Sequence, residues 1–156
     1  MKLAAVAAGA LLLGSALGPY DIDLFATAKA PAAQGHARLV FAPSPFGVAV
    51  TEDGRASYDV QITASALPAP ATLGQYTAYV AWVTSTDLSE WHRLGTVTNG
   101  TTTLGRAELN KFLLVITAEA DSVATTHAGP TILHGNSPSG WLQSFLTHPL
   151  FRGIAQ

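Results

Sequence analysis

The sequence predicts an all-β protein, an antiparallel β-sandwich of the immunoglobulin-like kind that is followed by a short C-terminal helix. About eight short β-prone segments recur along the chain and are separated by Gly and Pro, a pattern typical of sandwiches. The segment Tyr76–Ser85 (YTAYVAWVTS) is rich in residue types that favour strands, and neither of its alternating faces is strongly polar. Charged residues make up only 12% of the 156-residue chain, about half the usual share. We therefore expect Tyr76–Ser85 to be a central strand that is covered on both faces.

The N-terminus has the features of a secretory signal peptide. Lys2 precedes an apolar run, Leu3–Gly18, which is shorter than the ~20 residues that span a bilayer comfortably. Ala26-Thr27-Ala28 supplies an A-x-A cleavage pattern, and a cut near Ala16 or Gly18 is the alternative. An uncleaved anchor is the competing interpretation. We expect an exported protein, periplasmic or extracellular, without a membrane span in its mature form.

The chain is accordingly divided into a signal peptide (residues 1–28), a flexible lead-in (29–36), a β-sandwich domain (37–135) and a C-terminal helical tail (136–156). Apolar and polar residues alternate along Ser57–Ser65, which predicts a half-buried strand. Phe112–Ala120 (FLLVITAEA) is the second strongly apolar run and the expected neighbour of the central strand. Asn99-Gly100 is a hairpin signal that should fold residues 101–104 back on the strand before it. The other expected strands are Ala37–Ala42, Phe46–Thr51, Trp91–Thr98 and Pro130–His134.

The pattern of the last segment changes from period 2 to a helical spacing. Asn136-Ser137-Pro138-Ser139 resembles a helix cap, and apolar residues then recur along one stripe of Gly140–Thr147 before Pro149 ends the segment. A helix this short is marginal alone in water, so we expect Ser139–Phe151 to pack on its own sheet or on a partner.

Composition excludes several classes of function. The formal net charge is -2, and the eight Lys and Arg residues are scattered, so no basic face for nucleic acid is expected. The absence of cysteine excludes disulfides, thiolate catalysis and Cys-based zinc sites. No G-x-S-x-G run occurs, and the acidic pairs lie in or beside turns. We therefore expect neither an enzyme nor a bound cofactor.

Five histidines are the remaining chemical resource. His127 and His134 flank Gly129-Pro130, and a short strand there brings both to one edge. His148 or His92 as a third ligand would complete an all-nitrogen copper or zinc site. The alternative is that each histidine is an isolated surface or loop residue, because the spacing matches no recognised metal motif.

Three aromatic residues are candidates for partner binding. Trp91 begins a strand, and Trp141 and Phe145 lie on the apolar stripe of the terminal helix. Tryptophans in such positions usually belong to the core. If they are exposed, they form a contact surface for a partner or a glycan, or for self-association.

Several short motifs occur in an order that resembles one family. A half-buried strand ends in Leu67-Pro68, a Pro-rich linker leads to Tyr76, and Trp82 lies near the end of the strand that follows. Further along are Leu94-Gly95-Thr96, Thr117-Ala118-Glu119 and Gly129-Pro130-Thr131-Ile132-Leu133. This order is similar to the extracytoplasmic C-terminal domain of anti-sigma-K factors, over about Leu39–Gly135.

The resemblance implies a small exported β-sandwich, the sensor half of such a factor standing alone. Two residues precede the apolar run, where these factors carry a cytoplasmic sigma-binding domain and a membrane helix. The Glu-Pro-Gly-Gly-Ser turn expected after the Thr-x-Glu strand is replaced by Glu119-Ala120-Asp121-Ser122. Sigma sequestration is therefore not carried over, and an interaction, sensor-like or structural module is the function expected.

Overall fold

The computed structural model describes residues 20–42 and 57–137, and these residues form one antiparallel sheet of eight strands. The all-β class expected from the sequence is confirmed. A short 3-10 helix, η1 (Pro70–Leu73), lies in the Pro-rich linker between the third and fourth strands. In chain order the strands are β1 (Asp21–Ala26), β2 (Gln34–Phe41), β3 (Tyr58–Ser65), β4 (Ala78–Thr84), β5 (Trp91–Val97), β6 (Gly100–Ala107), β7 (Leu113–Glu119) and β8 (Thr131–Asn136).

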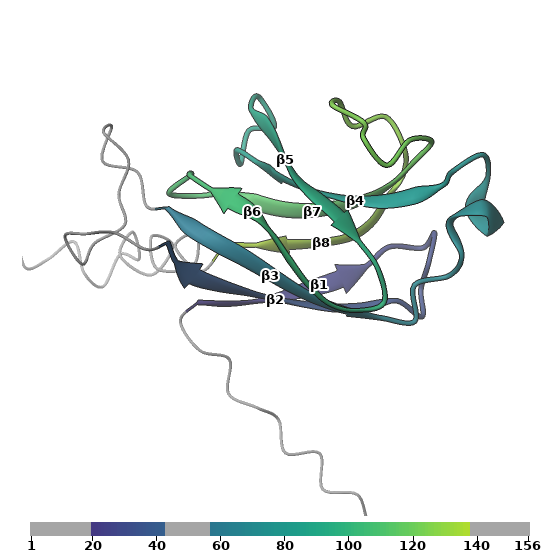
Figure 1. Cartoon of the computed structure of the whole chain (residues 1–156), viewed down its shortest axis with the longest axis horizontal. Helices are drawn as coiled ribbons and strands as arrows, with labels where there is room; N and C mark the ends of the chain where they lie inside the picture. The colour runs from purple at the N-terminus through teal and green to yellow at the C-terminus, as the bar shows by residue number, and fades with distance from the viewer. Residues whose placement is uncertain (1–19, 43–56, 138–156) are drawn as a thin grey trace, which may run out of the picture.

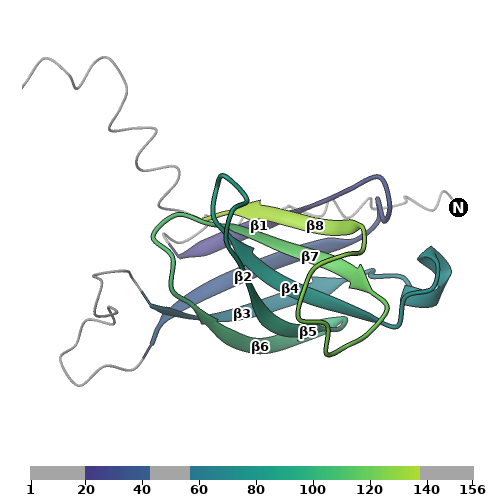
Figure 2. The same cartoon turned by 90° about the horizontal axis from the view of Figure 1, so that it is seen from above.

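The sheet curls into a nearly closed barrel. Its strand order is β5-β4-β7-β8-β1-β2-β3-β6, so β5 and β6 are its two edges. The sheet bends at β1, because the two halves of this strand have different partners. Asp21–Leu24 pair with β2, whereas Phe25 and Ala26 pair with β8. Two facing layers result, one containing β2 and β3 and the other β4 and β7 (Figure 1). β5 and β6 lie side by side where the barrel almost closes (Figure 2), and a Cβ on Gly105 would lie only 3.0 Å from the carbonyl oxygen of Leu94.

The hydrophobic core fills the space between the two layers. The alternation predicted for β3 holds, since Val60, Ile62 and Ala64 are buried while Thr63 and Ser65 are exposed. All seven residues of β4 are buried, and β7 pairs with it from end to end, so the predictions of a doubly covered central strand and of its neighbour are confirmed. The largest members of the core are Ile62, Phe112, Leu114, Ile116, Ile132 and Leu133.

β1 and the start of β2 fall within the residues that the sequence assigned to the signal peptide (1–28) and to the lead-in (29–36). Asp21–Ala26 is a strand between β8 and β2, with Ile22 and Leu24 almost fully buried in the core. A cut after Ala28 would remove this strand and unpair both of its neighbours. Residues 29–36 are not a free lead-in either, because β2 begins at Gln34 and Ala30 and Ala33 are buried.

The hairpin predicted at Asn99-Gly100 is wrong in its pairing. β6 forms its ladder with β3, and β5 forms its ladder with β4. The side chain of Asn99 instead pairs with the backbone of Leu67, accepting from its N–H at 2.9 Å and donating to its carbonyl at 3.0 Å. Because Asn99 is held in this way, the chain turns a corner from one layer to the other instead of reversing on itself.

Some predicted features lie outside the described residues. These are the run Leu3–Gly18, the strand Phe46–Thr51 and the tail Ser139–Phe151 with Trp141 and Phe145. Within residues 20–42 and 57–137, no helix is long and apolar enough to cross a membrane.

Candidate functional site

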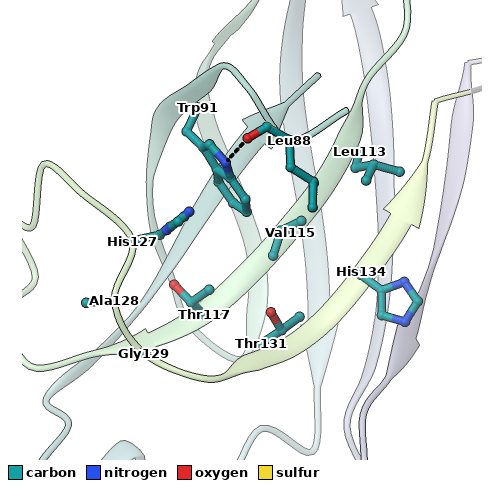
Figure 3. A pocket seen from close by; sticks show the side chains of 10 residues that line it. All are labelled: Leu88, Trp91, Leu113, Val115, Thr117, His127, Ala128, Gly129, Thr131 and His134. Atoms are coloured by element: carbon teal, nitrogen blue, oxygen red, sulfur yellow. Dashed lines mark hydrogen bonds between the residues drawn. The ribbon is translucent and has the colours of Figure 1, made fainter. Parts of the chain in front are cut away.

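A groove lies on the outer face of the layer that contains β4, β7 and β8. Alternate residues of β4, namely Ala78, Val80, Trp82 and Thr84, point away from the core, yet all four are buried. The loop between β4 and β5 and the loop between β7 and β8 cover part of this face. The space left between them is an open groove of about 500 Å³ (Figure 3). Its lining comprises Leu88, Trp91, Leu113, Val115, Thr117, His127, Ala128, Gly129, Thr131 and His134.

The floor of the groove follows from strand register. Leu113, Val115 and Thr117 alternate along β7 and therefore project on the same side. Val115 lies opposite Trp82 on β4 and opposite His134 on β8. His134 in turn lies opposite Phe25 of β1, whose side chain is 61% exposed. The row of cross-strand neighbours gives the floor an apolar centre with an aromatic border.

Leu88 and Trp91 form the wall at the β5 side. Leu88 is 53% exposed and has a positive φ of 61°, a left-handed conformation that a bulky residue adopts rarely. Its backbone is held on both sides, since its N–H donates to the Ser85 carbonyl at 2.9 Å and its carbonyl accepts from the Trp91 indole at 3.0 Å. The second bond is drawn in Figure 3. The loop thus holds a leucine out of the core at the rim of the groove.

Asp87 stabilises the loop between β4 and β5 by accepting hydrogen bonds from other residues of the same loop. Its Oδ1 accepts from the hydroxyl of Ser89 at 2.7 Å and from the backbone N–H of Ser89 at 3.2 Å, and it also accepts from the hydroxyl of Ser85. The hydrogen bonds from Ser85 and then from Ser89 lower the pKa of the Asp87 carboxyl to about 2. Ser85 Oγ also accepts from the backbone N–H groups of Ser89 and Glu90. These hydrogen bonds between neighbouring residues therefore stabilise the loop conformation in which Leu88 is exposed.

His127 and the two tryptophans form the opposite corner of the groove. The His127 ring meets Trp91 edge to face, with centroids 3.6 Å apart, and lies 6.2 Å from the Trp82 ring. Trp82 is 1% exposed, and its indole N–H donates to Thr117 Oγ1 at 2.9 Å. Trp82 is therefore a buried support beneath the groove, whereas Trp91 is half-buried and reaches its surface.

A buried carboxyl group fixes the loop that carries His127. Glu119 is 3% exposed, and its Oε1 accepts from the Thr117 hydroxyl at 2.6 Å. Its two oxygens also accept from the backbone N–H groups of Ala128 and Gly129 at 3.2–3.3 Å. With the Trp82 indole, these bonds form a continuous chain from β4 through β7 to the loop. The loop is held by hydrogen bonds to Glu119, without a cation among the bonded groups.

Gly129 is required by close backbone packing at the same place. A Cβ at this position would overlap the carbonyl oxygen of Ala118. Because the backbone passes this close, Pro130 can accept from the Ala118 N–H at 3.1 Å, and β8 begins one residue later. The Gly129-Pro130 pair is therefore a closely packed junction between the loop and the sheet.

The structure brings together three of the residues singled out from the sequence. Trp91, His127 and His134 all line the groove, with His127 and His134 on opposite sides of its floor (Figure 3). His92 lies on β5 with an exposed side chain, and His148 is outside the described residues. Across residues 20–42 and 57–137, no group of three or more His, Cys, Asp and Glu side chains is arranged to hold a metal ion.

Three contributors were missed by sequence reasoning. Leu88 was not singled out, because nothing in its local sequence indicates a left-handed conformation. Val115 was expected on a strand, and its alternation with Thr117 would have placed both on one face. Glu119 was treated as a solvated acid beside a turn, although its place at the end of a strand with no polar face was a signal of burial.

Comparison with known proteins adds no family to this geometry. No protein-family model, no curated protein and no solved structure matches the chain.

Proposed function

We propose that the protein is an exported, non-catalytic interaction module that binds an apolar, aromatic-containing polypeptide segment in the groove. The observation that carries the proposal is Leu88, a large apolar side chain held in solvent by a left-handed backbone. Such a conformation costs on the order of 1–3 kcal/mol and is found mostly at functional sites. A leucine that served only the fold would gain by turning inward.

The chemistry of the lining favours apolar side chains as the ligand. None of the ten lining residues is Asp, Glu, Lys or Arg, so the groove offers no fixed charge to an ionic ligand. Leu113 and Val115 form an apolar floor, and Trp91 is the kind of aromatic anchor around which binding energy concentrates. Thr117 does not offer its hydroxyl proton to a ligand, because that proton is donated to Glu119. A sugar, which needs several free polar partners, is served less well by this groove.

The remaining parts of the proposal concern export and family. The Leu3–Gly18 run supports secretion, and the position of β1 supports a cleavage that falls before Tyr20. The motif order around Leu67-Pro68 and Gly129-Pro130 supports a sensor-like role similar to that of anti-sigma-K extracytoplasmic domains. The two facing layers are compatible with the immunoglobulin-like sandwich that the resemblance implies, in a form nearly closed by β5 and β6.

Peptide selection against the purified full chain tests the proposal. Peptides selected from a random displayed library are measured by calorimetry against the wild type, Leu88→Asp and Val40→Asp. Val40 is the matched control, since it is 51% exposed and lies on the layer away from the groove. We expect apolar and aromatic sequences, with Kd weakened at least tenfold by Leu88→Asp and unchanged by Val40→Asp. Equal effects of the two substitutions would refute the groove as the binding site.

The second candidate is a copper or zinc accessory protein, and the observation favouring it is that His127 and His134 line the same groove. Titration of copper(II) and zinc(II) into the protein tests it. A metal present at 100 times its Kd should stabilise the fold by about 2.7 kcal/mol. Stabilisation that is lost in the His127→Ala, His134→Ala double variant would replace the interaction proposal with the metal one.

A further inference from the structure

We infer that the segment that occupies the groove is the chain's own C-terminal stretch, Ser139–Phe151. The inference rests on the proposed function, because it identifies the polypeptide that the groove receives.

The chain leaves the barrel at a fixed point beside the groove. Ser137 is 3% exposed, and its backbone N–H donates to the Phe112 carbonyl at 2.9 Å. Its hydroxyl oxygen accepts from the Phe112 N–H at 3.1 Å. Leu113, the next residue of β7, lines the groove and lies opposite Asn136. The last described residue, Ser137, is therefore paired with the residue of β7 that precedes a groove-lining one.

The first aromatic residue of the stretch is within reach of the groove floor. Trp141 follows Ser137 by four positions, which span at most about 14 Å when extended. Val115 lies one strand from β8 and two residues along β7 from Leu113, a separation of about 8 Å at ordinary strand spacing. Phe145, one helical turn further on, can reach the wall formed by Leu88 and Trp91.

The apolar stripe of Ser139–Phe151 also matches the groove in chemistry, because both are apolar. Trp141, Leu142, Phe145 and Leu146 fall on one side of a helical spacing, so their apolar character matches that of Leu113 and Val115 on the groove floor. A helix of this length is not stable by itself in water and gains order only by packing. On the groove side, Leu88 is 53% exposed at the rim.

Occupation within one chain is favoured over exchange between two copies by the shortness of the tether. A few residues between anchor and ligand give an effective concentration in the millimolar range. A second copy competes only when the protein itself reaches such concentrations. On this inference, any other polypeptide that carries the same apolar pattern must displace the C-terminal stretch from the groove.

Cysteine cross-linking in the full chain tests this directly, because the natural sequence contains no cysteine. One double variant carries Leu88→Cys and Ser144→Cys, and the control carries Val40→Cys and Ser144→Cys. Leu88 follows β4 and Val40 lies on β2, and both strands are two places from β8 in the sheet, on opposite sides. The two partner sites have matched exposure, 53% and 51%. Mild oxidation is followed by intact mass under dilute conditions.

We expect an intramolecular disulfide that forms at least tenfold faster for the Leu88 pair than for the Val40 pair. Adding Trp141→Ser and Phe145→Ser should abolish this preference. Equal rates for the two pairs would overturn the inference, and so would a disulfide that forms only between chains. If the cross-linking experiment contradicts the inference, the proposed function can still be tested separately. If the Trp141→Ser, Phe145→Ser chain still binds selected peptides with dependence on Leu88, the groove is a binding site and only its occupant was wrong.

Discussion

Replacement of Glu119 by Ala tests whether the buried carboxyl group holds the loop of the groove. The substitution removes the acceptor of the Thr117 hydroxyl and of the Ala128 and Gly129 amides. A buried donor that loses its partner costs about 1–3 kcal/mol. Thr117 is 2% exposed and bears that cost in full, whereas the two amides are only partly buried and water can replace part of their loss. We therefore expect the free energy of unfolding to fall by about 2–5 kcal/mol.

Equilibrium urea unfolding measures the total change, and hydrogen exchange locates it. Exchange of the Ala128 and Gly129 amides should accelerate far more than exchange of the β3 amides, because the carboxyl group acts on the loop. Glu108→Ala is the control, since Glu108 is exposed and its loss should change stability by less than about 0.5 kcal/mol. An effect of Glu119→Ala no larger than that of Glu108→Ala would refute the network as a source of stability.

Four further predictions follow from the same structure. Trp82→Ala should cost about 3–5 kcal/mol in urea unfolding, and a change below about 1 kcal/mol would mean that the ring is not buried. Gly129→Ala should destabilise by about 1–3 kcal/mol or more, with the largest shifts in an NMR spectrum at Ala118, since the new Cβ meets its carbonyl oxygen. An NMR titration should give the Asp87 carboxyl a pKa of about 2, and Ser85→Ala should raise that pKa toward 3.8. Because this pKa is lowered on folding, the ionised carboxyl stabilises the loop above pH 3.8, and this stabilisation is lost as the pH falls through about 2. An Asp87 that titrates near 3.8 in the wild type would contradict the hydrogen bonds assigned to its carboxyl group. Intact mass of secreted protein should show a new N-terminus before Tyr20, and one at Lys29 would contradict the placement of β1.

The fold class and the central pair of strands were accessible from the sequence because both depend on local pattern. Alternation in β3 and the apolar composition of β4 and β7 reflect burial on one or both faces of a sheet. The first strand was missed for a physical reason. Asp21–Ala26 follows a run that looks like a secretion signal, and only two of its residues, Ile22 and Leu24, are buried in the core. Its burial depends on β8, more than one hundred positions later.

The groove was only partly predictable. Trp91, His127 and His134 were singled out by residue type, and their meeting depends on the pairing of β7 with β8 and on the loop between those strands. The hairpin expected at Asn99 failed because a side-chain bond to Leu67, thirty-two positions away, outweighs the local turn preference. The display of Leu88 depends on a network among Ser85, Asp87 and Ser89 that residue types alone do not specify.

The central claim, that the groove beside Trp91 is occupied by the C-terminal stretch, is tested most directly by paramagnetic relaxation. A nitroxide is attached to the single cysteine of Ser144→Cys, and the spectrum of indole N–H groups is compared before and after its reduction. The chain holds three tryptophans, so the Trp91 resonance is easily isolated. We expect strong broadening of the Trp91 indole and of the Leu88 and Val115 methyl groups, with Val40 on the other layer unaffected. Trp91 and Val40 broadened to the same small extent would contradict the claim.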